Sequence, residues 1–144
     1  MKSLVTMVLI LGLSLNSFSQ DWLTNLEQTK ISASNENKNI ILVFSGSDWC
    51  APCIKLEKKI WESSEFQNEA KKHWVLLKAD FPRKRSNKLS KEQTKENEKI
   101  AELYNKNGYF PLVVVLNPKG EILGSTAYKE YSPKEYIKLL HSFE

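Results

Sequence analysis

One stretch of the sequence decides the fold, IILVFSGSDWCAPC at residues 40–53. Its first five residues form an uninterrupted apolar run in which β-branched side chains predominate. A strand that is covered on both faces, as in the middle of a mainly parallel sheet, has this composition. The polar residues 45–48 predict a loop after the strand, and a helix is expected over residues 50–60.

Two cysteines open the predicted helix. Cys50 and Cys53 stand three positions apart, a spacing at which they can close a small disulfide ring without unwinding the helix. The helix N-terminus presents unpaired amides and a partial positive charge, which stabilise a thiolate at Cys50. Thiols in such motifs ionise near neutrality, whereas a free cysteine has a pKa of about 8.5. We therefore expect Cys50 to be the more acidic and the more exposed thiol.

Other uses of this cysteine pair have weaker support. A zinc site lacks a second pair of ligands, because no other CxxC occurs and His73 and His141 lie 68 positions apart instead of roughly 3–5. Ile54, not histidine, follows Cys53, which excludes a c-type haem site. An inert structural disulfide stays open, although so small a loop constrains the unfolded chain little. Both histidines are expected at ordinary surface or boundary positions.

Residues 1–19 have the pattern of a cleaved secretory signal peptide. Lys2 supplies a positive start, residues 4–15 are mainly apolar, and Ser17 and Ser19 are small residues at alternate positions. At about 1.5 Å per residue the apolar run reaches roughly 18 Å, which is short of the ~30 Å hydrocarbon core that an uncleaved anchor would span. We expect residues 20–144 to form a single domain outside the cytoplasm, where thiols oxidise.

The composition excludes several classes of protein. With 41% hydrophobic and 26% charged residues, the chain is not disordered as a whole. Lys and Arg number 21 against 17 Asp and Glu, and this excess is too small for a nucleic-acid binder. Two cysteines are too few for a disulfide-stapled scaffold.

The remaining chain alternates helices and strands. Helices are expected over residues 21–34 and 66–72, from Ser90 to a stop at Gly108, and from Ser132 onward; strands are expected at 74–80, 112–116 and 121–127, with a turn at 117–120. Capping boxes are predicted for Ser90 with Gln93 and for Ser132 with Glu135. Strands separated by helices pair in parallel, and the final hairpin adds antiparallel strands. The sequence thus predicts an α/β fold with a mixed central sheet and helices on both faces.

A proline precedes the strand at 112–116. Pro111 cannot donate to a sheet ladder, and prolines in tight connections at functional sites are often cis. A plain junction between loop and strand would have the same sequence.

Together these features resemble the thioredoxin superfamily. The resemblance covers essentially all of residues 20–144: the strand–WCxxC–helix unit, a strand ending in Asp80, Pro111 before a strand, the terminal hairpin and the closing helix. Within this superfamily, residues 44–50 and 80–82 most resemble the exported single-domain thioredoxin-like proteins of Gram-negative bacteria. The resemblance implies a three-layer thioredoxin-like fold.

The resemblance also implies roles for individual residues. Cys50 would be the attacking thiol and Cys53 the resolving thiol of a redox-active disulfide. Pro111 would be a cis-proline that packs against the disulfide, and the backbone of Phe110 would pair with an extended substrate chain, with Trp49 as a further substrate-binding residue. No metal or organic cofactor is implied.

Three departures from the thioredoxin pattern stand out. One is the dipeptide between the cysteines, Ala51-Pro52, where cytoplasmic thioredoxins have Gly-Pro. Phe44 occupies the position, six residues before the attacking cysteine, where cytoplasmic thioredoxins carry a buried Asp that accepts the proton of the resolving thiol. Lys78, Asp80 or Glu57 could replace that acid through water. In addition, residues 82–97 carry six cationic and two acidic residues, which suggests either docking to an acidic partner or a solvated insertion.

We expect an exported enzyme that acts as a monomer in the periplasm, a thiol–disulfide oxidoreductase for protein or peptide disulfides. The dipeptide Ala51-Pro52 lacks the His that stabilises the thiolate in strongly oxidising relatives, which favours a reductase or isomerase. A reductase would need a membrane thiol electron donor. A thiol oxidase and a non-catalytic binding protein on a thioredoxin scaffold remain as alternatives, the latter because of Phe44.

Overall fold

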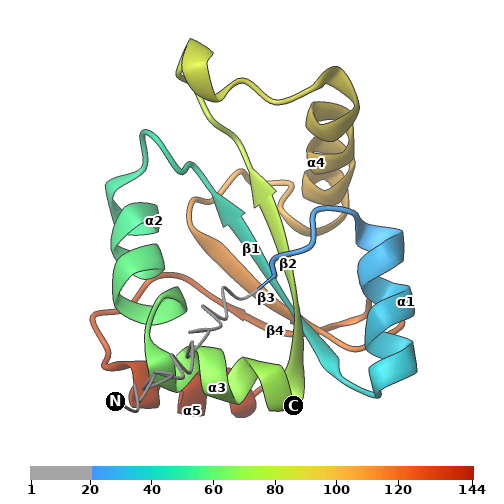
Figure 1. The fold of residues 1–144 in the computed structure, drawn as a ribbon, viewed down its shortest axis with the longest axis vertical. Helices are drawn as coiled ribbons and strands as arrows, with labels where there is room; N and C mark the ends of the chain where they lie inside the picture. Colours follow the sequence, from blue (N-terminus) through green and yellow to red (C-terminus); the bar gives the residue numbers. More distant parts are fainter. Residues whose placement is uncertain (1–20) are drawn as a thin grey trace, which may run out of the picture.

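A four-stranded mixed sheet forms the centre of the fold in the computed structural model, which describes residues 21–144 (Figure 1). The strands are β1 (Asn39–Ser45), β2 (Trp74–Asp80), β3 (Leu112–Leu116) and β4 (Ile122–Thr126), in the order β2-β1-β3-β4. β1 pairs in parallel with β2 and antiparallel with β3, and β4 adds an antiparallel edge. The mixed sheet is confirmed; the predicted signal peptide, residues 1–19, lies outside the described residues.

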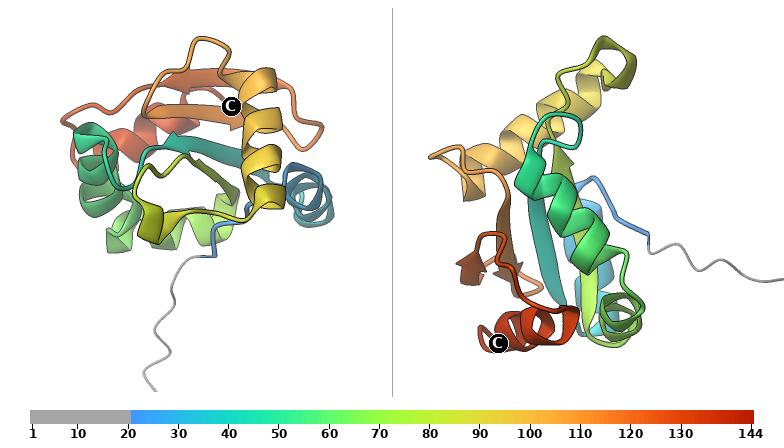
Figure 2. Two further views of the ribbon diagram at one scale, coloured as in Figure 1. Left: turned by 90° about the horizontal axis from the view of Figure 1, so that it is seen from above. Right: turned by 90° about the vertical axis from the view of Figure 1, so that its left-hand side faces the viewer.

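Helices cover both faces of this sheet, as the two views of Figure 2 show. One face carries α2 (Ala51–Leu56) with its π-helical continuation η1 (Glu57–Trp61), α3 (Ser64–His73) and α5 (Pro133–His141). The other face carries α1 (Leu26–Glu36) and α4 (Lys91–Tyr104), and a short 3₁₀ turn, η2 (Arg85–Asn87), precedes α4. This arrangement confirms the three-layer fold. Within residues 21–144 no helix is long and apolar enough to cross a membrane.

The central strand β1 contributes to two hydrophobic cores. Ile41 and Val43 pack with α2, η1, α3 and α5, whereas Ile40, Leu42 and Phe44 pack with α1 and α4. All five side chains are at most 1% exposed. Because side chains alternate along a strand, an apolar run without polar interruption is what two covered faces require.

The N-terminal segment differs from the prediction. Trp22 and Leu23 precede α1, and Leu23 forms a parallel bridge with Leu77 on the free edge of β2, where its backbone bonds to Leu76 and Lys78. An edge strand leaves unpaired backbone groups, and this segment satisfies some of them. The helix starts only at Leu26, five residues after the predicted start at residue 21, and Ile31 on it is 61% exposed.

The start of α4 also differs in one detail. The hydroxyl of Ser90 accepts from the backbone N–H of Gln93, but the Gln93 side chain does not reach back. It donates instead to the carbonyl of Thr24 at 2.9 Å and to Asn97 at 2.8 Å, so it ties α4 to the segment before α1. The capping box of α5, Ser132 with Glu135, is complete as predicted.

Candidate active site

The cysteine pair lies where the chain leaves β1 and enters α2. Cys50 and Cys53 form a disulfide with their Cα atoms 5.2 Å apart. Cys50 is the N-cap of α2, and its Sγ accepts a hydrogen bond from the backbone N–H of Cys53 at 3.3 Å. The N–H of Gly46 donates to Cys53 Sγ at 3.5 Å. In the reduced protein such amide donors stabilise negative charge on sulfur, as a helix N-terminus does.

The two sulfurs differ in position more than in exposure. Cys50 is 5% exposed and Cys53 3% exposed, so in the disulfide form the expected difference in accessibility is slight. Cys50 nevertheless stands at the N-cap, whereas Cys53 lies inside the first turn of α2. The asymmetry that distinguishes the two thiols is therefore the position of each on the helix.

An aromatic cluster lies beside the disulfide. The ring centroids of Trp49 and Phe110 are 5.4 Å apart and those of Phe110 and Phe81 5.5 Å apart, both in edge-to-face geometry. Trp49 Nε1 donates to the carbonyl of Phe81 at 2.7 Å, and the guanidinium of Arg83 lies 3.7 Å from the Trp49 ring centroid. A Cβ at Gly46 would collide with the Trp49 ring, so only glycine fits there.

Pro111 lies at the same end of the sheet. The Phe110–Pro111 peptide bond is cis, as expected, and Pro111 is buried. Because Leu112 pairs with Phe44 in the antiparallel register, Pro111 comes next to the end of β1 from which the cysteine loop departs. Asn105, which sequence reasoning missed, accepts from the N–H of Tyr109 at 2.9 Å and donates to its carbonyl at 2.8 Å, so it holds the chain just before Phe110.

Two aspartates cross-link the loops around the disulfide. Asp80 accepts from the N–H of Ser47 at 3.0 Å and from its hydroxyl at 2.6 Å. In the opposite direction, Asp48 accepts from the N–H groups of Arg83 and Lys84 at 2.9 and 3.0 Å and from the side chain of Asn87. The Arg83 amide, then Asn87, hold the pKa of Asp48 below its usual value. Asp48 was missed because its partners lie about 35 positions away in the chain.

The structure separates the position of the usual acid, Phe44, from the residues that could replace that acid. Phe44 is fully buried in the core that faces α1 and α4. Glu57 accepts from Lys78 Nζ at 2.9 Å, and both line a cavity of about 250 Å³ whose wall includes Cys53. The carboxylate of Asp80 bonds to Ser47 instead. The structure thus brings Glu57 and Lys78 to the Cys53 cavity and directs Asp80 to the loop.

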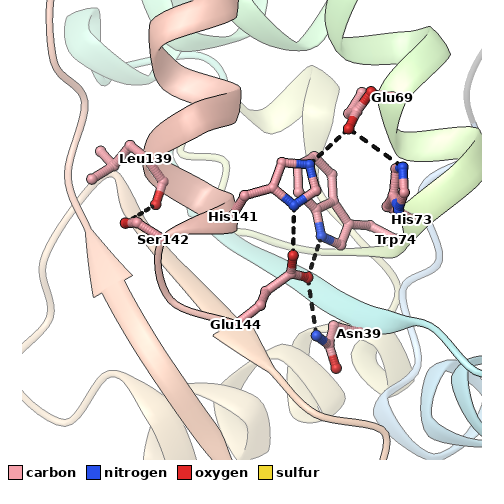
Figure 3. Close-up of polar contacts among 8 residues, drawn as sticks. All are labelled: Asn39, Glu69, His73, Trp74, Leu139, His141, Ser142 and Glu144. Atoms are coloured by element: carbon pink, nitrogen blue, oxygen red, sulfur yellow. Dashed lines mark hydrogen bonds and ion pairs between the residues drawn. The ribbon is translucent and has the colours of Figure 1, made fainter.

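The two histidines meet at the opposite end of the sheet (Figure 3). His141 lies between Glu144, at 2.6 Å from Nδ1, and Glu69, at 2.7 Å from Nε2; Glu69 also lies 3.5 Å from His73. Glu144 accepts in addition from the indole of Trp74 at 2.8 Å. Burial lowers the pKa of His141, but the hydrogen bonds that its ring donates to Glu144 and Glu69 outweigh burial and raise the pKa above its usual value. This cluster ties α5 to α3 and β2, away from the disulfide.

Residues 21–118 match the model of the thioredoxin-like family. The chain belongs to the thioredoxin-like family. This thioredoxin-like protein is 32% identical over 134 residues to the disulfide bond reductase DsbH of Chlamydia pneumoniae, covering 82% of this chain and 79% of that protein. A solved structure of the DsbH oxidoreductase superposes with a TM-score of 0.78 at 30% identity, covering 85% of this chain and 83% of the other.

A second relative is more distant. The thioredoxin-related protein DsbJ of Chlamydia pneumoniae is 27% identical over 88 residues, which is 56% of this chain but 25% of DsbJ. The family match, the disulfide of the WCAPC motif and the similarity to DsbH together make this thioredoxin-like protein a thiol–disulfide oxidoreductase.

Proposed function

We propose that this protein is an exported disulfide reductase that acts on protein or peptide disulfides through the Cys50–Cys53 couple. The observation that carries the proposal is the disulfide at the N-terminus of α2, with an amide donor directed at each sulfur, in a chain similar to a disulfide bond reductase. The signal-like residues 1–19 support export to the periplasm, with residues 20–144 as the mature domain.

The two cysteines have different roles in the cycle. The Cys50 thiolate attacks one sulfur of the substrate disulfide, forms a mixed disulfide and releases the first substrate thiolate. The Cys53 thiolate then attacks the Cys50 sulfur, which releases the second substrate thiolate and closes the Cys50–Cys53 disulfide. Two electrons pass to the substrate, and the protons of the two cysteine thiols reach its two thiolates through solvent. The N-cap position supports Cys50 as the attacking thiol, because charge is best stabilised there.

The substrate chain is proposed to bind across the segment before β3. The backbone of Phe110 would pair with an extended substrate chain, a form of strand addition, and Pro111 and Trp49 would contact the residues near its disulfide. Asn105 supports this role by holding Tyr109 at both backbone groups, which orients the segment before a substrate arrives.

A reductase must be returned to its dithiol form. We propose a membrane thiol carrier as the electron donor, in a relay of thiol–disulfide exchanges, and a monomer as the working state. The small apolar dipeptide Ala51-Pro52 places no cation between the cysteines, which supports a reducing rather than a strongly oxidising couple.

The reduction potential of the Cys50–Cys53 couple tests the direction. A value near about −270 mV, as in thioredoxin, supports a reductase, and a value near about −120 mV, as in DsbA, supports an oxidase. Insulin precipitation in the presence of dithiothreitol tests whether the protein catalyses exchange at all. A rate no faster than the uncatalysed background would favour a non-catalytic binding protein on the same scaffold.

A further inference from the structure

The excess positive charge of this protein is concentrated beside the disulfide. Residues 82–97 hold six cationic and two acidic residues, a net charge of +4 that equals the net charge of the whole chain, so the rest of the sequence is balanced. Four of the six, Arg83, Lys84, Arg85 and Lys88, are exposed side chains of the segment 82–88, which we term the cationic loop. Figure 1 shows this loop beyond the end of β2. β1 ends at the same end of the sheet, where the chain continues to α2.

The cationic loop is held against the cysteine loop. Both carboxylate oxygens of Asp48, two residues before Cys50, bond to the loop backbone or to Asn87. The guanidinium of Arg83 lies 3.7 Å from the Trp49 ring centroid. The loop is therefore preorganised at a fixed place relative to the sulfurs, which lowers the entropy that binding would cost.

A hollow of about 290 Å³ lies between the cationic loop and α4. Its lining combines the apolar side chains of Phe81, Pro82 and Leu89 with the four cations of the loop and with Asp80, Thr94 and Asn97. The carboxylate of Asp80 is bonded to Ser47 of the cysteine loop. Among residues 21–144, none of these four cations forms a salt bridge. Arg83 also stacks on Trp49, and Lys84 lies near the carboxylate of Asp48. The hollow thus offers an apolar surface with positive charges around it.

We propose that the cationic loop recognises an acidic segment of the disulfide-bonded protein that this enzyme reduces, next to the disulfide itself. The proposal rests on the reductase function proposed above. A polypeptide fits better than a flat anionic surface, because the hollow can take an apolar side chain while the cations face carboxylates close to it in sequence. Charge complementarity of this kind mainly raises the rate of association and selects among partners.

The test uses three peptides that share one disulfide loop and differ only in the flanking residues, which are acidic, uncharged or basic. Turnover is measured with glutathione reductase-coupled or dithiothreitol-driven recycling. At low ionic strength kcat/KM should be about tenfold higher for the acidic than for the uncharged peptide, at the lower end of the gain from electrostatic steering. In about 1 M salt the preference should disappear, since the screening length falls to ~3 Å.

A triple variant tests whether the loop is the origin of the preference. Lys84→Gln/Arg85→Gln/Lys88→Gln should bring the ratio of the acidic to the uncharged peptide close to one. Arg83 is left in place because it contacts Trp49. The matched control removes three exposed lysines at the other end of the sheet or on α5, Lys72→Gln/Lys119→Gln/Lys138→Gln, and should keep the ratio.

Binding is also measured apart from turnover. A peptide with acidic flanks and serine in place of cysteine should shift the amide NMR signals of residues 83–88 in the unmodified protein and not in the triple variant. Reduction of none of the peptides would refute the proposed function, while the NMR titration would still decide the binding surface. Equal rates on all three peptides, or a preference that survives in the triple variant, would overturn the inference. Binding to phosphatidylglycerol vesicles without any peptide preference would assign the loop to a membrane and overturn it as well.

Discussion

Replacing Glu57 tests how the resolving thiol loses its proton in a protein that has Phe44 in place of the usual acid. Cys53 is only 3% exposed, so solvent hydroxide has limited access to it. The cavity of about 250 Å³ that Cys53 shares with Glu57 is several times larger than the volume of one water, about 30 Å³, and Ser45, Ser47 and Lys78 add polar groups to its wall that a water could bind. We therefore expect Glu57, positioned by Lys78, to accept the Cys53 proton through water.

The expected effect of Glu57→Gln is a slower resolving step. A positioned general base contributes about 10²–10⁴-fold, and a base acting through water belongs at the low end. Resolution should slow by about 10²-fold near pH 7, which corresponds to about 2.7 kcal/mol in the activation free energy. Global stability should change little, because the Glu57–Lys78 pair is partly exposed and such pairs contribute about 0–1 kcal/mol.

Stopped-flow release of substrate from a preformed mixed disulfide with Cys50 measures this step between about pH 6 and 9. In the variant the rate should rise steeply with pH and approach that of the unmodified protein at the alkaline end, where hydroxide replaces the missing base. Glu65→Gln, which removes an exposed carboxylate in the first turn of α3, is the matched control. Equal rates for Glu57→Gln and the unmodified protein at pH 7 would refute the role of Glu57.

Three further predictions concern Phe44, Cys53 and His141. Phe44→Asp should lower the urea midpoint, because loss of the fully buried ring alone costs about 3–5 kcal/mol and burial raises the pKa of the new carboxyl; an unchanged midpoint would contradict the burial argument. Cys53→Ser should accumulate mixed disulfides through Cys50, detected on non-reducing gels, and a variant that traps nothing would reverse the roles of the two thiols. His141→Gln should lower the melting temperature more at about pH 6 than at about pH 8.5. The raised pKa of His141 means that its bonds to Glu69 and Glu144 add stability that is complete below its unfolded pKa of 6.5 and is lost as pH rises through the folded value, so a pH-independent difference would contradict the assignment.

The sequence alone determined the central strand and the redox motif. An apolar run of five residues has only one stable place in an α/β domain, between two covered faces, and β1 occupies it with all five side chains buried. A CxxC pair at a helix start needs no distant residue to form its ring, so the Cys50–Cys53 disulfide follows from local spacing. Strand β2 likewise has the predicted bounds, because its apolar pattern and its flanks are local signals.

Only the tertiary structure decided which distant side chains surround that motif. The bonds from Asp48 to the cationic loop, the Trp49–Phe110 contact and the cavity shared by Cys53 and Lys78 join residues from 25 to more than 60 positions apart, and no periodic pattern in the chain predicts such pairs. The same reason explains the error at Leu23. Its local pattern favours a helix. In the folded protein, however, the free edge of β2 offers hydrogen bonds to the backbone of Leu23, and the segment pairs with that edge instead.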